Sequence, residues 1–387
     1  MDKKPEKLVP EVRFKGFTDD WEQHKLENVF TKYQKRINPT QQNLELWSLT
    51  IDQGLVAKTK RYDRSFLVRK NDIFNLVPKG YFVYNPMNIT LGTIDVNKYH
   101  SIAVSGYYIV LKSNDQFNVA FLASLLHTSS MINKYKRFST GSLLEKQRLQ
   151  FPNFAKVKII SPRLSEQTKI GLLMNQVNNL IDLQQRKLEQ LKQLKKAMLQ
   201  YLLTTEKKSA PLIRNKNYNN KWDTTTFSKL LNYERPENYI VTNTNYRKNG
   251  IPVLTANKSF ILGYTNEPNV YNKGEAIIFD DFTLENKFVN FPFMIKSSAI
   301  KILTSKVNYS LYFIFQLLQH TKFIKEGHAR HYISVVQKQI VRIPPSYEEQ
   351  ESISDTFSRI QSLIKLQQNK IDQYTTLKKY LLQKMFI

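Results

Sequence analysis

The sequence predicts an α+β protein with two similar α/β domains, each followed by a long helix, and the two helices pair as an antiparallel coiled coil with pseudo-two-fold symmetry. Three observations lead to this fold class. The chain contains an internal repeat, the repeated segments have the apolar spacing of long helices, and smaller elements precede both of them in the same order.

The internal repeat lies near residues 160 and 345. With an offset of 183, Pro162–Leu203 aligns with Pro345–Phe386 without a gap, and 16 of the 42 aligned positions are identical. The two segments are therefore two copies of one element, and the copy number sets the architecture of the chain.

Each repeated segment predicts a long helix, because its apolar residues recur in steps of three and four, the spacing of a coiled-coil seam. A proline at each entrance and acidic residues in the first turn are typical of a helix start, and Ser346 with Glu349 has the spacing of a capping box. About 33 residues at 1.5 Å each make a rod of roughly 50 Å. The residues expected to pair are Ile170, Val177, Leu180, Gln184, Leu188 and Leu191 in the first helix and Ile353, Ile360, Leu363, Gln367, Ile371 and Tyr374 in the second. The same spacing continues the seams through Leu194, Met198 and Tyr201 and through Leu377, Leu381 and Met385.

Both seams are interrupted by a glutamine in the same slot, Gln184 and Gln367. In an antiparallel pair with matched ends, Gln184 faces Ile371 and Gln367 faces Leu188, which brings the glutamines within about one turn of each other. A buried polar pair there fixes the register at some cost in stability. The alternative is that both glutamines lie at a solvated edge of the seam.

The regions before the two helices differ in sequence but share the order of their elements. A tryptophan stands near each domain start, at Trp21 and Trp222, and the Asn- and Lys-rich stretch between the halves predicts a linker. The shared order is a strand segment, a helix, a Gly loop and a short strand, which are Ile102–Ser113, Val119–Arg137, Ser139–Ser142 and Val157–Ile160 in the first half and Phe293–Ser305, Tyr309–Glu326, Gly327–Arg330 and Gln339–Ile343 in the second. The predicted boundaries are 1–160 for the first domain, 161–204 for the central spacer helix, 205–220 for the linker, 221–344 for the second domain and 345–387 for the C-terminal spacer helix.

The charge balance points to a polyanionic partner. The chain has 58 Lys and Arg against 32 Asp and Glu, a formal net charge of +26, and such self-repulsion is offset most commonly by nucleic acid. Because 41% of the residues are hydrophobic, the chain can build real cores, which excludes a disordered basic tail.

The absence of cysteine and the composition of the N-terminus further limit which kinds of site and which cellular location the protein can have. The chain has no Cys, which excludes disulfides, Cys-containing zinc sites and a thiol nucleophile. Its start is charged and has no apolar core of signal-peptide length, and no run approaches the roughly 18 apolar residues of a membrane span. We therefore expect a cytoplasmic protein.

Two similar domains on a paired rod suggest two readers held at a fixed separation. The rods are more alike than the domains, as expected of readers of different sequences on a common spacer, and a rod of about 50 Å is compatible with one helical turn of DNA, about 34 Å. The combination predicts a DNA-binding scaffold with a split, asymmetric target.

At this point the chain resembles the specificity subunits of type I restriction-modification systems over its whole length. The resemblance rests on the opening Pro10–Phe14 with Gly16-Phe17, Trp21-Glu22 and Lys25-Leu26, and on Pro162 and Pro345, each followed by the pair Glu-Gln and then an isoleucine. The chain departs from the family pattern after Trp222, where Asp223-Thr224-Thr225 replaces the usual Glu-x-x-x-Leu continuation.

The resemblance implies a subunit without catalysis of its own. Its two target recognition domains each read one half of a bipartite site, and it joins two methyltransferase (modification) subunits, which bind S-adenosylmethionine and methylate adenine at N6. Restriction/translocase subunits, which use ATP and Mg, add cleavage of unmethylated DNA. The family thus implies double-stranded DNA and these subunits as partners, and no cofactor bound by this chain.

The motifs of an enzyme are mostly absent. Asn85-Pro86-Met87-Asn88 is the nearest approach to an adenine methyltransferase loop, but it lacks the second proline and the aromatic residue, so it predicts a turn. A phosphate-binding Gly-x4-Gly-Lys-Ser/Thr loop is also missing. The alternative to the scaffold is a duplicated-domain nucleic-acid enzyme, such as a nuclease with an unrecognised site.

Two clusters leave chemistry open in the second half. Asp281, Glu285 and Lys287 resemble a nuclease metal triad, although a solvated loop is the simpler interpretation. His328 and His331 are a weak candidate for a metal site, and we predict no metal. The alternatives for this loop are DNA contact, since Arg330, His331 and Tyr332 carry hydrogen-bond donors, and a purely structural role.

Basic residues interleaved with aromatic ones mark the expected DNA-binding surface. Arg pairs with guanine and Asn or Gln with adenine, whereas Lys-rich clusters favour phosphate. The DNA-binding candidates are Lys32, Lys35, Arg36, Lys58, Lys60, Arg61, Tyr62, Arg64, Lys136, Arg137, Ser139, Thr140 and Ser142 in the first domain and Tyr246, Arg247, Lys248, Lys258, Arg330, His331 and Tyr332 in the second.

Overall fold

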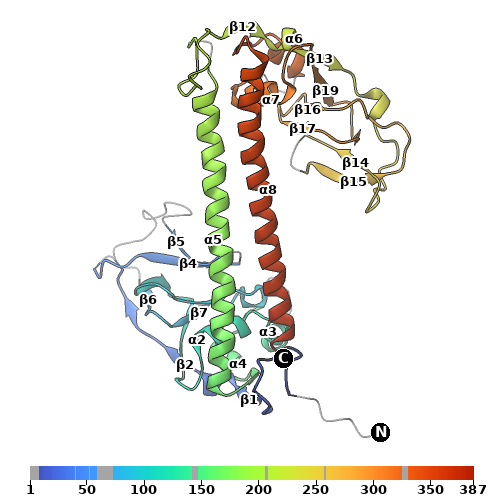
Figure 1. Cartoon of the computed structure of the whole chain (residues 1–387). Helices are drawn as coiled ribbons and strands as arrows, with labels where there is room; N and C mark the ends of the chain where they lie inside the picture. The colour runs from blue at the N-terminus through green and yellow to red at the C-terminus, as the bar shows by residue number, and fades with distance from the viewer. Residues whose placement is uncertain are drawn as a thin grey trace. The chain divides into compact units, whose positions relative to one another are not determined.

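The computed structural model describes residues 8–39, 41–51, 53–58, 73–141, 147–204, 208–256, 259–324 and 330–387. The chain divides into two compact units (Figure 1). The first unit contains the chain up to Gln185 together with Lys370–Ile387, and the second contains Arg186–Asn369. Each unit therefore holds one globular domain and a part of both long helices, α5 (Leu164–Leu202) and α8 (Tyr347–Lys384).

The described residues of the first unit form three antiparallel or mixed sheets. A two-stranded sheet joins the start of the domain to the strand before α5. The other two are a four-stranded sheet of order β2-β10-β7-β8 and a five-stranded sheet of order β3-β6-β9-β4-β5. The strands are β1 (Glu22–Lys25), β2 (Phe30–Tyr33), β3 (Arg36–Ile37), β4 (Leu46–Thr50), β5 (Gly54–Ala57), β6 (Phe74–Val77), β7 (Phe82–Tyr84), β8 (Ile94–Val96), β9 (Ile102–Ser105), β10 (Ile109–Ser113) and β11 (Lys158–Ser161).

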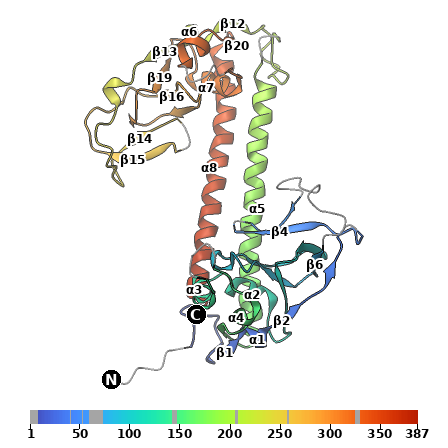
Figure 2. The same cartoon turned by 180° about the vertical axis from the view of Figure 1, so that it is seen from behind.

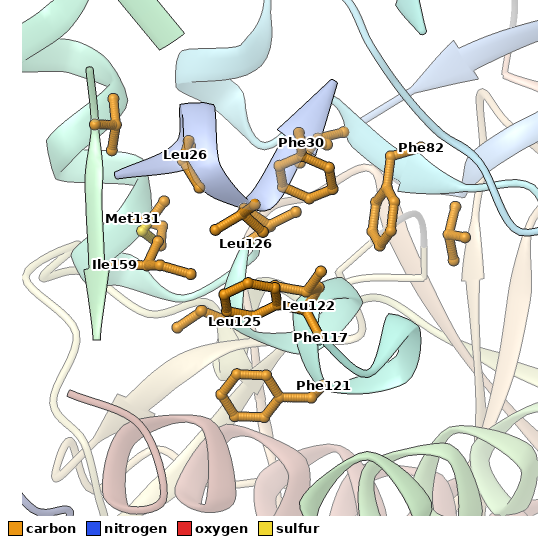
Figure 3. Close-up of a cluster of buried hydrophobic side chains, with 14 of the residues drawn as sticks. Leu26, Phe30, Phe82, Phe117, Phe121, Leu122, Leu125, Leu126, Met131 and Ile159 are labelled. Atoms are coloured by element: carbon orange, nitrogen blue, oxygen red, sulfur yellow. The ribbon is translucent and has the colours of Figure 1, made fainter. Parts of the chain in front are cut away.

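Short helices cover the four-stranded sheet and form the main core of this unit. The Asn118 side chain accepts the N–H groups of Ala120 and Phe121 and so begins α2, whose apolar face carries Phe121 and Leu122. Figure 3 shows these side chains gathered with Phe30 of β2 and neighbouring residues. The helices of the domain are α1 (Leu26–Val29), α2 (Val119–Leu125), α3 (Ser129–Phe138) and α4 (Phe151–Ala155), with a 3₁₀ turn at Ile89–Leu91.

The second unit repeats this plan with a smaller outer sheet. A two-stranded sheet, β12-β20, again joins the domain start to the strand before its long helix, and a four-stranded sheet has the order β13-β19-β16-β17, but the outer sheet has three strands, β15-β14-β18. The elements are β12 (Asp223–Thr226), α6 (Phe227–Leu230), β13 (Leu231–Glu234), β14 (Ile251–Leu254), β15 (Ile261–Thr265), β16 (Ala276–Asp280), β17 (Asn286–Val289), β18 (Met294–Ile295), β19 (Ile300–Ser305), α7 (Leu311–His320) and β20 (Ile340–Ile343), with a 3₁₀ turn at Glu237–Tyr239 and a π-helical turn at Tyr332–Val336.

The long helices pack against each other within each unit. In the first unit the early part of α5 shares a core with the end of α8, and Phe121 of α2 stacks on Phe386 with ring centroids 5.4 Å apart. In the second unit the end of α5 shares a core with the early part of α8, and Lys195 donates to the Gln361 side chain over 2.7 Å. Each unit therefore has the antiparallel arrangement that the sequence predicts.

The duplicated Glu-Gln pair attaches each domain to its long helix. Gln167 accepts the backbone N–H of Asn118 and donates to the carbonyl of Pro162. Gln350 repeats this by accepting the N–H of Ser310 and donating to the carbonyl of Pro344. The helix start is thereby fixed to the N-cap of α2 in the first unit and of α7 in the second. Figure 2 shows α2 beside the early part of α5, as Figure 1 does.

The preceding glutamates hold an arginine from the segment before each domain. Arg13 binds Glu166 through two nitrogens, at 2.7 and 2.8 Å, and Arg214 binds Glu349 in the same way, at 2.7 and 2.7 Å. Ser346 caps Glu349 as predicted, since its hydroxyl accepts the Glu349 N–H. The capping box is incomplete, however, because the Glu349 carboxylate binds Arg214 rather than the start of the helix.

The segment predicted as a linker is an ordered second copy of the N-terminal segment. With an offset of 201, Arg13 and Trp21 align with Arg214 and Trp222. The N–H of Trp21 binds the carbonyl of Leu8, and the N–H of Trp222 binds that of Ser209. The backbone also binds a long helix at equivalent places, from Val12 to Lys384 and from Ile213 to Tyr201, at 2.9 Å in both cases. The described part, residues 208–220, therefore belongs to the second domain.

Candidate nucleic-acid interface and helix surface

Several basic candidates of the first domain are exposed on adjoining elements. Lys32 lies on β2, and Lys35 and Arg36 follow at the turn into β3. Lys136 and Arg137 occupy the last turn of α3, an exposed position next to the Gly loop. These side chains are free to meet a phosphate backbone.

Other candidates of this domain have structural partners. The Lys58 ammonium lies 5.6 Å from the centroid of the Phe74 ring. Ser139 donates to the Tyr135 carbonyl and so closes α3, and Thr140 forms an isolated antiparallel bridge with Arg148. Lys60, Arg61, Tyr62, Arg64 and Ser142 lie outside the described residues.

The second domain keeps only part of its predicted surface. Arg247 and Lys248 are exposed before β14, and Arg330 is exposed before the π-helical turn. Tyr246 is half-buried against Gly263, where an added Cβ would lie 2.3 Å from the Tyr246 Cβ. Lys258 and His328 lie outside the described residues.

The prediction that His331 and Tyr332 contact DNA is wrong, because both side chains are 0% exposed. The backbone N–H of His331 binds the carbonyl of Asp281, and the N–H of Tyr332 binds its carboxylate over 2.8 Å. The two residues are thus held in the core by a turn far away in sequence, and of the predicted trio only Arg330 remains at the surface.

Asp281 is not in a solvated loop either. Its carboxylate is buried and lies 3.7 Å from the ammonium of Lys301, itself buried and bonded to the Ser298 carbonyl. Glu285 is exposed on the same turn. Among the residues that the structure describes, no group of three or more His, Asp or Glu side chains could hold a metal ion. The described turn therefore offers no nuclease-like centre.

The two long helices carry exposed leucines at equivalent positions. Leu183 and Leu194 of α5 are 47% and 50% exposed, and Leu366 and Leu377 of α8, each 183 residues later, are 53% and 43% exposed. At 3.6 residues per turn, residues 11 apart lie within about 20° of each other around a helix. The exposed apolar residues on these faces are Leu172, Leu180, Leu183, Leu194 and Tyr201 on α5 and Leu363, Leu366, Leu377 and Tyr380 on α8, and we call each set a leucine stripe.

The leucine stripes correct the predicted seam at Leu180, Leu194 and Tyr201 in the first helix and at Leu363 and Leu377 in the second. Leu180 and Leu363 were expected to pair inside the seam, but they are 39% and 51% exposed. They lie between the buried side and the rest of the leucine stripe, about 60° around the helix from Leu183 and Leu366. The other predicted seam residues are buried or half-buried, including Gln184 and Gln367, which do not lie at a solvated edge.

Sequence reasoning missed these stripes although their signal was present. A helix with one buried seam needs only one apolar stripe, and leucines beyond that stripe, repeated at the same positions in both copies, indicate a second surface. None of the helices in the described ranges combines the length and the apolar character that a membrane span requires.

Comparison with known protein families shows that one family model matches two regions of the chain. The model of the type I restriction modification DNA specificity domain matches residues 18–193 and again residues 207–375, which together make up most of the chain. The two matches correspond to the two copies of the domain described above.

Individual relatives agree with this assignment. Over 136 residues the chain is 39% identical to the specificity subunit of the type I restriction enzyme EcoR124I/EcoR124II from Escherichia coli, a match that spans 33% of this chain and 33% of that protein. The crystal structure of the S subunit of a type I restriction-modification system from M. genitalium is similar with a TM-score of 0.69, covering 98% of this chain and 99% of the other at 12% identity. At that identity the similarity shows a shared fold.

Proposed function

The chain belongs to the type I restriction modification DNA specificity domain family, with two copies of the domain, and we propose that it is the non-catalytic specificity subunit of a type I restriction-modification complex. Each domain reads one half of a bipartite, asymmetric DNA target, and the paired helices set the separation of the two halves. The complex acts in the cytoplasm and protects the host against foreign DNA.

The observation that carries this proposal is duplication of the attachment beside divergence of the domains. The Arg-Glu pair, the Gln bridge and the buried tryptophan recur in both units with closely similar geometry. The outer sheets and exposed loops differ in strand number and residues. An asymmetric split target requires two domains that recognise different DNA sequences and are attached to the long helices in the same way.

The leucine stripes support docking of two methyltransferase subunits. Single exposed apolar side chains are ordinary, but apolar residues repeated along one helix face are typical of helix recognition by a partner. Because the stripe occurs once on each copy of the helix, the chain offers two equivalent sites. Each site accepts the apolar face of one methyltransferase subunit.

The chemistry resides on those partners. The methyltransferase subunits bind S-adenosylmethionine and transfer its methyl group to adenine N6, and the restriction subunits bind ATP and Mg for translocation and cleavage. This chain contributes the DNA contacts and the assembly. A nuclease with its own site gains no support, since the suggestive Asp281 is engaged with Lys301 in the core.

Reconstitution tests this assignment. The purified chain, the methyltransferase subunit of the same host's type I system, and both together are incubated with radiolabelled S-adenosylmethionine and host genomic DNA, and the masses of intact complexes are measured. We expect methyl transfer only from the mixture, in a complex of one chain with two methyltransferase subunits. DNA cleavage or methylation by the chain alone contradicts the proposal.

A further inference from the structure

One tight turn occurs at the same place in both domains and is built in the same way. In the first domain it directly follows β7, at the start of the connection to β8, and the buried Asn85 side chain accepts a hydrogen bond from the N–H of Met87 over 3.0 Å. In the second it links β16 to β17, and the buried Asp280 side chain accepts the N–H of Phe282 over 3.0 Å and of Thr283 over 2.9 Å. Met87 and Phe282 are therefore structurally equivalent.

A second backbone contact places an arginine beside each turn. The N–H of Leu149 binds the carbonyl of Pro86 over 2.9 Å, and the N–H of His331 binds the carbonyl of Asp281 over 3.0 Å. The residues just before these two donors are Arg148 and Arg330, and both are exposed. Each domain thus presents an arginine next to the turn, on the segment that leads to its last strand.

The turns expose apolar side chains although their backbones are fixed. Met87 is 45% exposed and Phe282 is 43% exposed, whereas the Asn85 and Asp280 side chains that hold them are buried. Since the turns are braced by hydrogen bonds on both sides, these side chains are presented outward by a firm support. Recognition of a DNA sequence requires such rigid support, because a loosely held side chain discriminates poorly between bases.

The pairing of these two side-chain types matches the chemistry of base edges. Arginine can donate two hydrogen bonds to guanine, and an apolar side chain contacts the methyl group of thymine or enters a base step. In the first domain the turn also lies near basic Lys136 and Arg137, because Thr140, just after α3, bridges to Arg148. The neighbouring positive charge suits the phosphates that flank the bases.

We infer that Met87 with Arg148 and Phe282 with Arg330 are the equivalent base-reading tips of the two domains, and that their different apolar residues contribute to the different half-sites. This inference rests on the proposed function and names residues that carry it out. Each tip acts on its own half of the target, so a change in one tip leaves the reading of the other half intact.

The test uses the complete complex in cells and reads the specificity directly. Strains that express the chain and its methyltransferase subunit carry Arg148→Ala, Arg330→Ala, Met87→Ala or Phe282→Ala, and long-read sequencing records the methylated adenine motif of the host genome. Matched controls are the exposed Arg163→Ala and Arg235→Ala for the arginines, and Leu164→Ala and Ile340→Ala, 45% and 44% exposed, for the apolar residues.

We expect each tip variant to relax the motif at one or two positions of one half-site only, with an arginine change lowering discrimination there by about 5- to 150-fold. The two arginine variants should relax opposite halves, and the controls should leave the motif unchanged. A uniform fall in methylation with an unchanged motif would assign the arginines to phosphate and overturn the inference.

Two further outcomes are decided by additional measurements. If Arg148→Ala or Arg330→Ala abolishes methylation, the corresponding Arg→Gln variant separates the cases, because glutamine pairs with adenine rather than with guanine. Adenine in place of guanine at one motif position supports base reading, and an unchanged motif contradicts it. If the unmodified chain itself yields no bipartite motif, the proposed function fails, whereas a normal motif that none of the four variants alters refutes only the tips.

Discussion

The attachments of the two domains are alike, whereas the domains themselves have diverged. In the first unit Asn118 faces Gly171 of the long helix, and an added Cβ on Gly171 would lie 2.5 Å from the Asn118 side-chain oxygen. In the second unit the equivalent residues are Ser310 and Ser354, whose hydroxyls lie 3.0 Å apart. The larger N-cap side chain, Asn118, thus faces a glycine, and the smaller one, Ser310, faces a serine. We call each such pair, one residue on the short helix and one on the long helix, the fitted pair of the joint.

Divergence is concentrated away from the joint. Among the residues that the structure describes, the outer sheet has five strands in the first unit and three in the second, and only the second unit buries a Lys-Asp pair beneath its turn. This contrast teaches that the contacts between each domain and its long helix are constrained by packing. The exposed sheet edges and turns, in contrast, are free to change with the DNA sequence to be read.

The largest expected effect comes from removing the Arg-Glu ion pairs that attach each domain to its long helix, Arg13–Glu166 and Arg214–Glu349. Glu166→Ala or Glu349→Ala leaves a largely buried arginine without its carboxylate, which costs about 3–5 kcal/mol of the free energy of unfolding. Urea unfolding of the purified variants measures this loss.

The two ion pairs should not contribute equally to stability. Glu349 also accepts the indole N–H of Trp222 over 3.2 Å, whereas the indole N–H of Trp21 has no hydrogen-bond partner among the described residues. We therefore expect the larger loss for Glu349→Ala. Equal losses, or a larger one for Glu166→Ala, would show that the extra bond contributes nothing.

The next effect separates the two leucine stripes. Leu183→Glu and Leu366→Glu place a charge on an exposed apolar face, so each should weaken binding of one methyltransferase subunit by about 10-fold or more while the chain keeps its fold. Native mass spectrometry should find complexes with one methyltransferase subunit for each single variant and none for the double variant. Gln185→Glu, on another face of α5, is the control and should retain two.

A smaller effect tests the fitted pair at the joint. Gly171→Ser pushes a side chain into Asn118 and should cost about 1–3 kcal/mol of unfolding free energy. Adding Asn118→Ser recreates the pair found in the second unit and should recover most of the loss. Thermal unfolding of the single and double variants measures the coupling, and additive losses would argue against a fitted pair.

The smallest effect concerns the buried glutamines of the seam. Gln184→Leu and Gln367→Leu replace polar groups that are 9% and 8% exposed, and each should raise the free energy of unfolding by about 1 kcal/mol or less. Chemical denaturation checks the sign. A clear loss of stability in both variants would mean that the glutamines contribute more through hydrogen bonds than they cost by burial.

The long helices were predictable because a period of three and four, sustained over a long segment and written twice, has few alternative structures. The second copy of the N-terminal segment was missed because it keeps few identities, chiefly Pro, Arg, Lys and Trp, and because its Asn-rich sequence is typical of a linker. The contacts of Arg214, Trp222 and the Ile213 backbone reveal it.

The site was less predictable than the fold. Sequence alone cannot show that His331 and Tyr332 are buried, since the hydrogen bonds that hold them come from Asp281, about 50 residues earlier. Leu180 and Leu363 were misassigned because they border both the seam and the leucine stripe, and apolar periodicity does not say which of two stripes meets the partner helix.

Long-read sequencing of methylated adenines in the host genome, with and without this gene, tests the central claim most directly. We predict that one bipartite N6-methyladenine motif, with two different halves and a fixed spacer, disappears when the gene is deleted and returns when it is restored. An unchanged set of methylated motifs, in a host that expresses the gene and its intact methyltransferase subunit, would contradict the assignment of this chain as the reader of the target.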